Sequence, residues 1–345
     1  MIKNIQLHNF RNFSERKISF CEGKNIIIWK NGKGKSNILE ALSLPISPLV
    51  ESDHKVLLKR NSDVFFLAYE LSHKNISFSY NGEENKKKYM IEKKSTTKQN
   101  FSAAYPHVIS FHPMKMNLLY LWPSHRRDFI DEILIQAFPE YKKILLWFKK
   151  VLTHRNKVLK NISIWKSDIS ELDFWDTKYI SWSLAIYSYR AKIVSYIKNH
   201  ISQLESCFFW KVWEVNFSYI SKLWLNISRD DVEEKIKEYQ QKEVILGKTL
   251  FWPHVDDFVI TIDWFPLIHY ASRWEVKSSL LSFIFIATNF LLKNSEKKEI
   301  IFIIDDILAE LDSEHRDVLW EYIWKKQCII TAIDDFEADW QKIFL

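Results

Sequence analysis

The chain opens with short segments whose hydrophobic and polar positions follow two different rhythms. Residues 2–7 alternate between apolar and polar side chains, whereas residues 25–28 end in a continuous apolar run. Alternation predicts a strand with one buried face, and a short apolar run predicts a strand buried on both faces. Residues 36–42 then combine good helix formers with an apolar face, which predicts a helix that begins near Lys35.

A change of rhythm divides the rest of the chain. Residues 64–110 read as further strands, whereas residues 124–241 repeat apolar positions every three or four residues, which predicts long helices. Strand patterns return towards the C-terminus with helices between them. The expected strands are residues 259–262, 300–304 and 328–331, and the expected helices begin after Ser272 and cover residues 313–324.

These segments predict an α/β fold in which a helical insertion interrupts one domain. The expected domain is discontinuous, with residues 1–112 and 246–345 on either side of a helical arm at residues 113–245. Asn81-Gly82 predicts a turn, and the lysine-rich residues 86–94 follow it. We expect those lysines to form a charged, solvated hairpin edge, with a DNA contact as the alternative.

Composition limits the class of protein only broadly. Hydrophobic residues make up 47% of the 345 positions and charged residues 27%, which indicates a globular chain. The net charge of +6 permits a polyanionic partner but does not require one. Cys21, Cys207 and Cys328 have no metal-like or paired spacing, so we expect reduced thiols in a cytoplasmic protein. The longest apolar run, residues 278–292, is too short to span a bilayer, and no membrane association is expected.

The apolar run at residues 26–28 leads into a phosphate-binding pattern. The pattern G-x-x-x-x-G-K-[ST] fits residues 29–36, with Trp29 at the first glycine position. Backbone N–H groups at the helix start would hold the phosphates, Lys35 would reach the β and γ oxygens, and Ser36 would bind Mg²⁺. A lysine-rich turn without a ligand is the alternative. The candidate nucleotide-binding residues are Trp29, Lys30, Asn31, Gly32, Lys33, Gly34, Lys35, Ser36 and Asn37.

A second pattern lies near the other end of the chain, where the apolar residues 300–304 are followed by Asp305 and Asp306. This is the Walker B form, in which Asp305 would hold Mg²⁺ and Asp306 would orient or deprotonate the attacking water. Acidic residues after a strand are more often a simple helix cap, but the phosphate-binding pattern favours the functional interpretation. Lys35 and Asp306 are therefore the candidate catalytic residues, and Ser36 and Asp305 the candidate metal ligands.

The long separation of these two motifs, filled by helices, resembles the ATP-binding heads of the ABC type found in the SMC and RecF group. Residues 309–312 resemble the D-loop of that group, and residues 272–277 resemble its signature motif S-x-G-E-x-K. The resemblance implies that the signature binds the γ-phosphate of ATP held by a second copy, so that ATP joins a homodimer. The residues concerned are Ser272, Trp274, Glu275, Lys277 and Asp312.

Further segments resemble the RecF family in particular and extend over nearly the whole chain. They are residues 7–12 ("L-x-N-F-R-N"), 124–131 ("R-R-x-F-L-D"), 154–160 ("Q-R-N-x-L-L-K"), 172–176 ("L-D-x-W-D") and 252–257 ("G-P-H-R-D-D"). The resemblance adds Arg11 and Asn12 to the expected nucleotide site. Val255 replaces an arginine of the family pattern, and Met114-Lys115 replaces an acidic-led pair, so the roles of those positions are in doubt here.

The RecF resemblance implies a slow, ATP-binding ATPase of DNA replication, recombinational repair and the SOS response. Such a protein would dimerise on ATP, bind double-stranded DNA at single-strand gaps and help RecR- and RecO-like mediators to load recombinase. DNA contacts would be made mainly to phosphates. Candidates are Lys149, Lys150, Arg155, Lys157 and Lys160, with a solvated helix face as the alternative.

Tryptophan and glycine usage is abnormal. The chain has 5 glycines and 15 tryptophans, whereas average usage would give roughly 24 glycines. Tryptophan stands at glycine positions of the family pattern, which are Trp29, Trp122, Trp182, Trp252, Trp264 and Trp274. Either the protein is a decayed relative, or its source reads UGA as glycine and these positions are glycine in the native protein. Decay would not spare Lys35, Ser36 and Asp305, so we favour recoding.

Recoding leaves individual tryptophans to be assigned. Trp175 stands where the family itself has tryptophan. The positions that the pattern does not decide are Trp147, Trp165, Trp210, Trp213, Trp224, Trp320, Trp324 and Trp340. As written, the sequence is expected to show strain at Trp29 and Trp274, with positive φ or side chains directed into the nucleotide space.

Two other functions remain to be weighed against the ATPase. Another SMC-like ATPase, such as the subunit of an overcoming-lysogenization nuclease, would carry an acidic metal-binding nuclease domain that this sequence lacks. A scaffold with a hydrolysis-dead head would bind DNA or partners without turning over ATP. The identity of the residues at positions 29 and 274 separates that scaffold from the ATPase.

Overall fold

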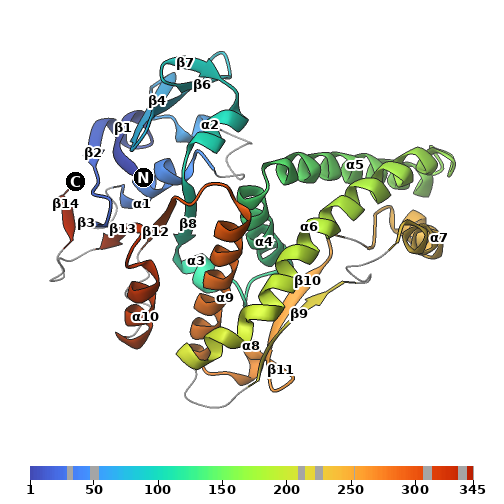
Figure 1. The fold of residues 1–345 in the computed structure, drawn as a ribbon. Helices are drawn as coiled ribbons and strands as arrows, with labels where there is room; N and C mark the ends of the chain where they lie inside the picture. Colours follow the sequence, from blue (N-terminus) through green and yellow to red (C-terminus); the bar gives the residue numbers. More distant parts are fainter. Residues whose placement is uncertain are drawn as a thin grey trace. The chain divides into compact units, whose positions relative to one another are not determined.

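The computed structural model describes residues 1–28, 34–46, 54–208, 214–221, 228–251, 253–305, 313–332 and 340–344. The chain divides into two compact units, one made of Met1–Asn117 and Glu296–Leu345 and the other of Leu118–Ser295 (Figure 1). The expected boundary at residue 112 lies close to the first division. The expected return to the first domain at residue 246 does not, because the strand and helices that follow belong to the second unit.

The first unit contains a six-stranded antiparallel sheet in the order β2-β1-β4-β5-β6-β7. Its strands are β1 (Ile2–Phe10), β2 (Phe13–Ser19), β4 (Val64–Leu71), β5 (Asn75–Asn81), β6 (Lys86–Ile91) and β7 (Lys94–Thr96). Alternate residues of β4 and β5 are buried, and they form one hydrophobic cluster with β1 and helix α1 (Lys35–Ser43). The Tyr69 hydroxyl donates a hydrogen bond of 2.7 Å to the Ala41 carbonyl, which ties β4 to α1.

A five-stranded parallel sheet completes the first unit, in the order β14-β3-β13-β12-β8. Its strands are β3 (Lys24–Ile28), β8 (His107–Phe111), β12 (Ile300–Ile304), β13 (Gln327–Ala332) and β14 (Gln341–Phe344), and the remaining elements are η2 (His54–Leu57), α2 (Lys98–Ala104), α3 (Pro113–Met116) and α10 (Ser313–Ile323). Every residue of β12 is buried, which confirms the strand predicted from its apolar run. Because the strands are parallel, the chain leaves β3, β13, β12 and β8 at the same edge of the sheet.

The second unit is mainly helical, as predicted, and carries one small sheet. Its helices are α4 (Pro123–Ala137), α5 (Pro139–Ser163), α6 (Glu171–Phe208), α7 (Arg229–Leu246), α8 (Leu267–Tyr270) and α9 (Arg273–Asn294), and its strands are β9 (Val215–Ile220), β10 (Asp257–Ile262) and β11 (Phe265–Pro266). Strand β9 corrects the prediction of helix through to residue 241. It pairs antiparallel with β10, which is why the chain from residue 246 onwards stays in this unit.

Helix α9 is the most apolar helix of the second unit and packs beside α4 and α6 (Figure 1). Among the described residues it alone has the length and composition to cross a membrane, but most of it is buried inside the protein. The rings of Phe129 and Phe283 join α4 to α9, and those of Tyr196 and Phe290 join α6 to α9. The continuous apolar sequence of α9 is therefore explained by its burial against α4 and α6.

Two exposed tryptophans of the second unit have left-handed backbone. Asp263 and Trp264 have φ of 45° and 73° and form the two-residue loop between β10 and β11. A hairpin loop with positive φ at both positions favours Asp-Gly. Trp165 has φ of 60° and follows the end of α5, where its N–H donates to the Ile162 carbonyl and that of Lys166 donates to the Asn161 carbonyl. This Schellman motif normally has glycine at the position of Trp165.

Candidate nucleotide site

The start of helix α1 has the backbone that a phosphate-binding loop requires. Gly34 is its N-cap and has φ of 109°, a left-handed conformation that a residue with a side chain rarely adopts. A Cβ atom at Gly34 would lie 2.7 Å from Asn12 Nδ2 and 2.9 Å from the Phe13 ring. Glycine is therefore required here for both conformation and space. The preceding candidates Trp29, Lys30, Asn31, Gly32 and Lys33 lie outside the described residues.

Lys35, the first residue of α1, is placed over the edge of the parallel sheet. Its side chain is 6% exposed, and Nζ lies 3.3 Å from the carbonyl oxygen of Ala332, the last residue of β13. The ammonium group is thus held at the edge where the parallel strands end. The next two candidates, Ser36 and Asn37, follow in the first turn of α1, where backbone N–H groups point towards the N-terminal end of the helix.

Asp305 directly follows β12 at the same edge of the sheet. Its backbone N–H donates to the Phe111 carbonyl at 2.8 Å, which continues the pairing of β12 with β8. Its carboxylate Oδ1 accepts a hydrogen bond of 2.8 Å from the hydroxyl of Thr331 on β13. Lys35 and Asp305 lie at opposite ends of the sequence, yet they contact the consecutive residues Ala332 and Thr331. We call the ends of β3, β13, β12 and β8, with these side chains, the nucleotide edge.

Arg11 and Asn12 contact helix α1 from the turn between β1 and β2. Arg11 donates to both carboxylate oxygens of Glu40, at 2.8 and 2.7 Å, and to the Val56 carbonyl at 2.8 Å. Its hydrogen bond to Glu40 raises the pKa of Arg11 against the opposing effect of burial. Asn12 accepts from the side-chain amide of Asn37 at 2.9 Å. In this structure both residues hold the phosphate-binding helix in place.

The expected dimer signature belongs to the second unit, at the start of α9. Ser272 is the N-cap, and its hydroxyl accepts from the Glu275 N–H at 3.2 Å while the Glu275 carboxylate accepts from the Ser272 N–H at 2.7 Å. This is a capping box. Trp274 and Lys277 follow in the helix, whereas Asp306 and Asp312 lie outside the described residues. Of the two forms of strain predicted at Trp274, positive φ is wrong, because the first turn of a helix takes right-handed backbone that any residue adopts. A side chain directed into the nucleotide space stays a prediction.

Family segments of the second unit meet in a set of partly buried arginine contacts that the sequence did not reveal as such. Arg126 donates to both carboxylate oxygens of Asp257, at 2.7 and 2.6 Å, and Arg127 donates to the Asp256 carbonyl at 2.6 Å. Arg126 and Arg127 of the segment 124–131 therefore contact Asp256 and Asp257. An Arg-Arg pair and an Asp-Asp pair in separate motifs were the available signal for this contact.

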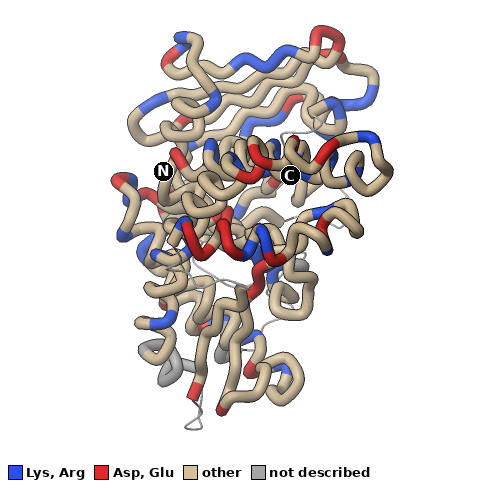
Figure 2. Tube along the Cα trace, turned by 90° about the vertical axis from the view of Figure 1, so that its right-hand side faces the viewer, with Lys and Arg blue, Asp and Glu red and all other residues tan. Residues whose placement is uncertain are grey.

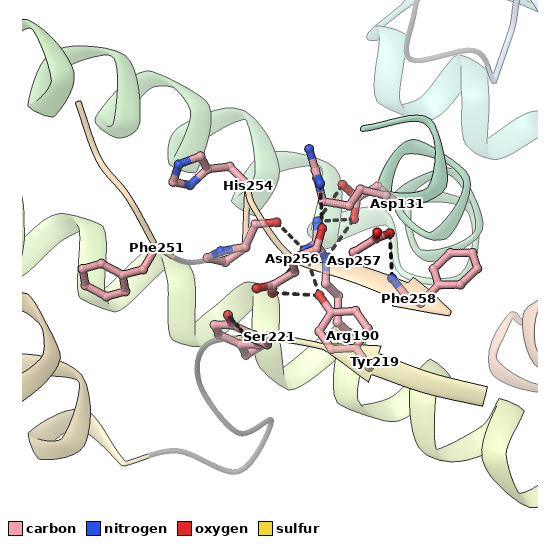
Figure 3. A network of polar contacts seen from close by, with 12 residues as sticks. Asp131, Arg190, Tyr219, Ser221, Phe251, His254, Asp256, Asp257 and Phe258 are labelled. Atoms are coloured by element: carbon pink, nitrogen blue, oxygen red, sulfur yellow. Dashed lines mark hydrogen bonds and ion pairs between the residues drawn. The ribbon is translucent and has the colours of Figure 1, made fainter. Parts of the chain in front are cut away.

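Arg190 of α6 lies at the centre of the same region (Figure 3). It donates to both carboxylate oxygens of Asp131, at 3.1 and 3.0 Å, and to the Pro253 carbonyl at 2.6 Å, and it lies 3.9 Å from the Asp256 carboxylate. Burial alone would lower the pKa of Arg190, but Asp131 and the surrounding phenols and carboxylate raise the pKa well above its ordinary value. The guanidinium is a permanent structural cation.

Arg155 of α5 is buried in a second set of ion pairs. It donates to Asp176 of α6 at 2.6 Å and lies 2.8 Å from the Glu243 carboxylate of α7 and 2.8 Å from the Thr249 hydroxyl. Its side chain has no exposed surface. The expectation that Arg155 contacts DNA is therefore wrong, because the helices α5, α6 and α7 enclose it. We call the buried contacts of Arg155 and Arg190, with the partly buried contacts of Arg126 and Arg127, the arginine network.

Comparison with known proteins agrees with this geometry. Residues 1–267 match the AAA ATPase domain family. The DNA replication and repair protein RecF of Ruminiclostridium cellulolyticum is 29% identical, covering 96% of this chain and 92% of that protein. RecF of Gloeothece citriformis is 26% identical, covering 99% and 96%. A solved structure of the recombination mediator protein RecF-ATPrS in the RecFOR pathway superposes with a TM-score of 0.87 at 23% identity, covering 99% of this chain and 96% of that one.

The fold and the phosphate-binding helix define a P-loop ATPase head of the ABC type, as the sequence predicted. The chain belongs to the AAA ATPase domain family, and it resembles proteins named RecF over almost its whole length. The expected ATPase activity is confirmed at the level of the family. The roles of the individual site residues remain predictions.

Proposed function

We propose that this chain is an ATP-dependent DNA-binding protein of recombinational repair, which dimerises on ATP and binds duplex DNA beside single-strand gaps. The observation that carries the proposal is the meeting of Lys35 and Asp305 at consecutive residues of β13. Relatives that carry the RecF name match almost the whole chain, so the proposal concerns the entire protein and not one domain of it.

The first turn of α1 is the proposed phosphate-binding site. Its outward N–H groups and the Lys35 ammonium would hold the β- and γ-phosphates of ATP. Ser36 and Asp305 would hold Mg²⁺, since hydroxyl and carboxylate oxygens are the ligands that this hard cation prefers. The residues fit the ion, because the backbone of Asp305 is fixed by Phe111 and its carboxylate is oriented by Thr331. The ion would neutralise phosphate charge, and Asp306 would orient the attacking water.

The start of α9 is the proposed dimerisation surface. Ser272 already accepts the Glu275 N–H, and a hydroxyl that accepts one hydrogen bond can still donate its own proton. We propose that it donates to the γ-phosphate of ATP held by a second copy, where the partial positive charge at the helix N-terminus favours an anion. Trp274, Glu275, Lys277 and Asp312 complete this surface, and an indole at position 274 would obstruct the phosphate where glycine would not.

DNA contact is proposed for the exposed lysines of α5. Lys149, Lys150, Lys157 and Lys160 are all exposed, and Glu140 is the acidic residue of this helix. Elsewhere along the trace Lys and Arg are interspersed with Asp and Glu (Figure 2). A helix with an excess of lysine suits phosphate contacts, which are salt-sensitive and largely independent of sequence. The lysines of β6 are exposed as well and offer a second phosphate-binding strip.

Gapped duplex DNA tests the proposal, with a chain that carries Trp29→Gly and Trp274→Gly. We expect ATP and Mg²⁺ to tighten binding, and Lys35→Ala to abolish that ATP-dependent part. In Lys149→Glu/Lys150→Glu, the loss of two phosphate contacts should flatten the slope of log affinity against log salt by roughly 1.8. Lys235→Glu, changed on the exposed face of α7, is the matched control. Equal salt slopes in all three chains would remove α5 from the DNA interface.

The proposal also includes partner proteins, and one other function competes with it. RecR- and RecO-like mediators are the proposed partners. Through them, the ATP-bound dimer on DNA would direct the loading of recombinase. A scaffold with a hydrolysis-dead head remains the competing proposal, favoured by the tryptophans written at positions 29 and 274. Peptide masses of the native protein decide between the two, since glycine at those positions supports the ATPase and tryptophan supports the scaffold.

A further inference from the structure

Strand β13 lies between the strand that leads into the phosphate-binding loop and the strand that leads into Asp305. Its last two residues contact both motifs, Ala332 through its carbonyl to Lys35 and Thr331 through its hydroxyl to Asp305. The side chain of Thr331 is 1% exposed, so it is a built-in part of the sheet and not a surface group.

We infer that Thr331 is a positioning residue for Asp305: its buried hydroxyl fixes one carboxylate oxygen so that the other is presented to the metal ion that accompanies ATP. The inference deepens the proposed function and rests on it. It assigns to β13 a part in metal binding that the sequence motifs do not contain, since Thr331 lies outside both the phosphate-binding and the Walker B patterns.

Among the described residues, two hydrogen bonds hold Asp305, one at its backbone and one at its carboxylate. Its backbone is held by the hydrogen bond to the Phe111 carbonyl, which sets where the side chain starts. What remains is rotation about the side-chain bonds, and the 2.8 Å hydrogen bond from Thr331 restricts that rotation. Outer contacts of this kind orient metal-binding carboxylates, and their loss typically costs 10–100-fold in metal affinity.

A purely structural role gives a different expectation. A buried hydroxyl needs an acceptor, and Asp305 could serve only that need. In that case Thr331→Val, which keeps the branched shape of the side chain, would alter stability but not the response to metal. Thr288 on α9 shows such a role, because its buried hydroxyl donates to the Ile284 carbonyl of its own helix at 2.7 Å. Thr288→Val is therefore the matched control.

The experiment measures binding of the non-hydrolysable analogue ADPNP over a titration of Mg²⁺, in the full chain carrying Trp29→Gly and Trp274→Gly. In Thr331→Val we expect the Mg²⁺ concentration at half-maximal binding to rise at least about tenfold, with metal-free binding in EDTA unchanged. Thr331→Ser should keep the parental midpoint, and so should Thr288→Val. Thr331→Ala, which also lacks the hydroxyl but cannot overpack the sheet, replaces Thr331→Val if that variant does not fold.

Each outcome decides the inference. An unchanged Mg²⁺ midpoint in Thr331→Val or Thr331→Ala overturns it and leaves the proposed function standing. A midpoint raised equally in Thr331→Ser overturns it too, because the hydroxyl would not be the cause. Metal-independent binding, or none, in the parent chain itself would contradict the proposed nucleotide site and the inference with it.

Discussion

The nucleotide edge of the first unit and the arginine network of the second unit both contain charged motif residues, but their charged side chains are held by different kinds of partner. At the nucleotide edge, Lys35 contacts the Ala332 carbonyl and Asp305 contacts the Thr331 hydroxyl, polar groups that orient a charged side chain. In the arginine network, Arg190 and Arg155 face carboxylates at 3.0 and 2.6 Å. The first arrangement suits charges that meet a ligand, and the second suits charges that join helices.

The difference shows that resemblance to a family does not by itself divide motif residues into chemical and architectural ones. Arg155 stands in a segment that resembles the family, and so does Lys35. Only their surroundings separate them, since an arginine enclosed by Asp176 and Glu243 has no free edge for a phosphate. Substitutions at the nucleotide edge should therefore impair ligand binding, whereas substitutions in the arginine network should lower stability.

The largest expected effect on stability is that of Arg190→Met. Removal of the guanidinium leaves the carboxylates of Asp131 and Asp256 buried without their cation, which should lower the free energy of unfolding by about 3–5 kcal/mol. Urea denaturation measures the change. Arg229→Met is the control, because its ion pair with Glu233 is exposed and contributes less than about 0.5 kcal/mol. A loss for Arg190→Met no larger than that of the control would show that the network does not support the fold.

An intermediate effect is expected from pH at His254, beside the arginine network (Figure 3). Burial, and then repulsion from Arg127, Arg155 and Arg190, lowers the pKa of His254 to about 4. The unfolded chain takes up the proton first, at a pKa near 6.5, so stability is fully present above pH 6.5 and is lost as the pH falls towards 4. At pH 5.5 the expected loss is about 1.4 kcal/mol.

His254→Gln should remove most of this dependence between pH 6.5 and 5.5, where few carboxylates titrate. Urea denaturation at several pH values measures it, and His8→Gln, changed on the exposed face of β1, serves as the control. A parental slope that persists in His254→Gln would mean that the histidine is not held neutral by its surroundings.

The smallest effect compares two helix ends in the second unit. Helix α7 ends in the same Schellman motif as α5, with Gly247 at φ of 62° where α5 has Trp165 at 60°. Trp165 is 96% exposed, so its replacement removes little packing. Trp165→Gly should raise the free energy of unfolding by about 1 kcal/mol, and Gly247→Ala should lower it by a similar amount. A loss of stability in Trp165→Gly would argue against glycine at this position in the native protein.

Local sequence rules predicted much of the fold and of the nucleotide edge. The apolar runs predicted the buried strands β3 and β12, and the glycine before Lys35 predicted the start of α1. These elements follow from neighbouring residues in the sequence. The second domain boundary and strand β9 were not predicted, because β9 is defined by its pairing with β10 across intervening helix. Arg155 was misread because an isolated lysine-rich helix does not show which of its cations another helix will cover.

The same limit applies to the tryptophans. Motif comparison identified Trp264 but left Trp165 undecided, and only the backbone shows that both positions have left-handed φ. Conversely, the positive φ expected as one form of strain at Trp274 is absent from its helical backbone.

We propose that ATP held at the nucleotide edge joins two copies of this chain. Sedimentation velocity of the chain carrying Trp29→Gly and Trp274→Gly, with ADPNP and Mg²⁺ and with nucleotide occupancy measured on the same samples, tests it most directly. We predict a nucleotide-dependent dimer for this parent, a monomer without nucleotide for Lys35→Ala, and a nucleotide-bound monomer for Ser272→Arg. A Lys35→Ala chain that dimerises as the parent does, or a parent that binds nucleotide and stays monomeric, would contradict the claim.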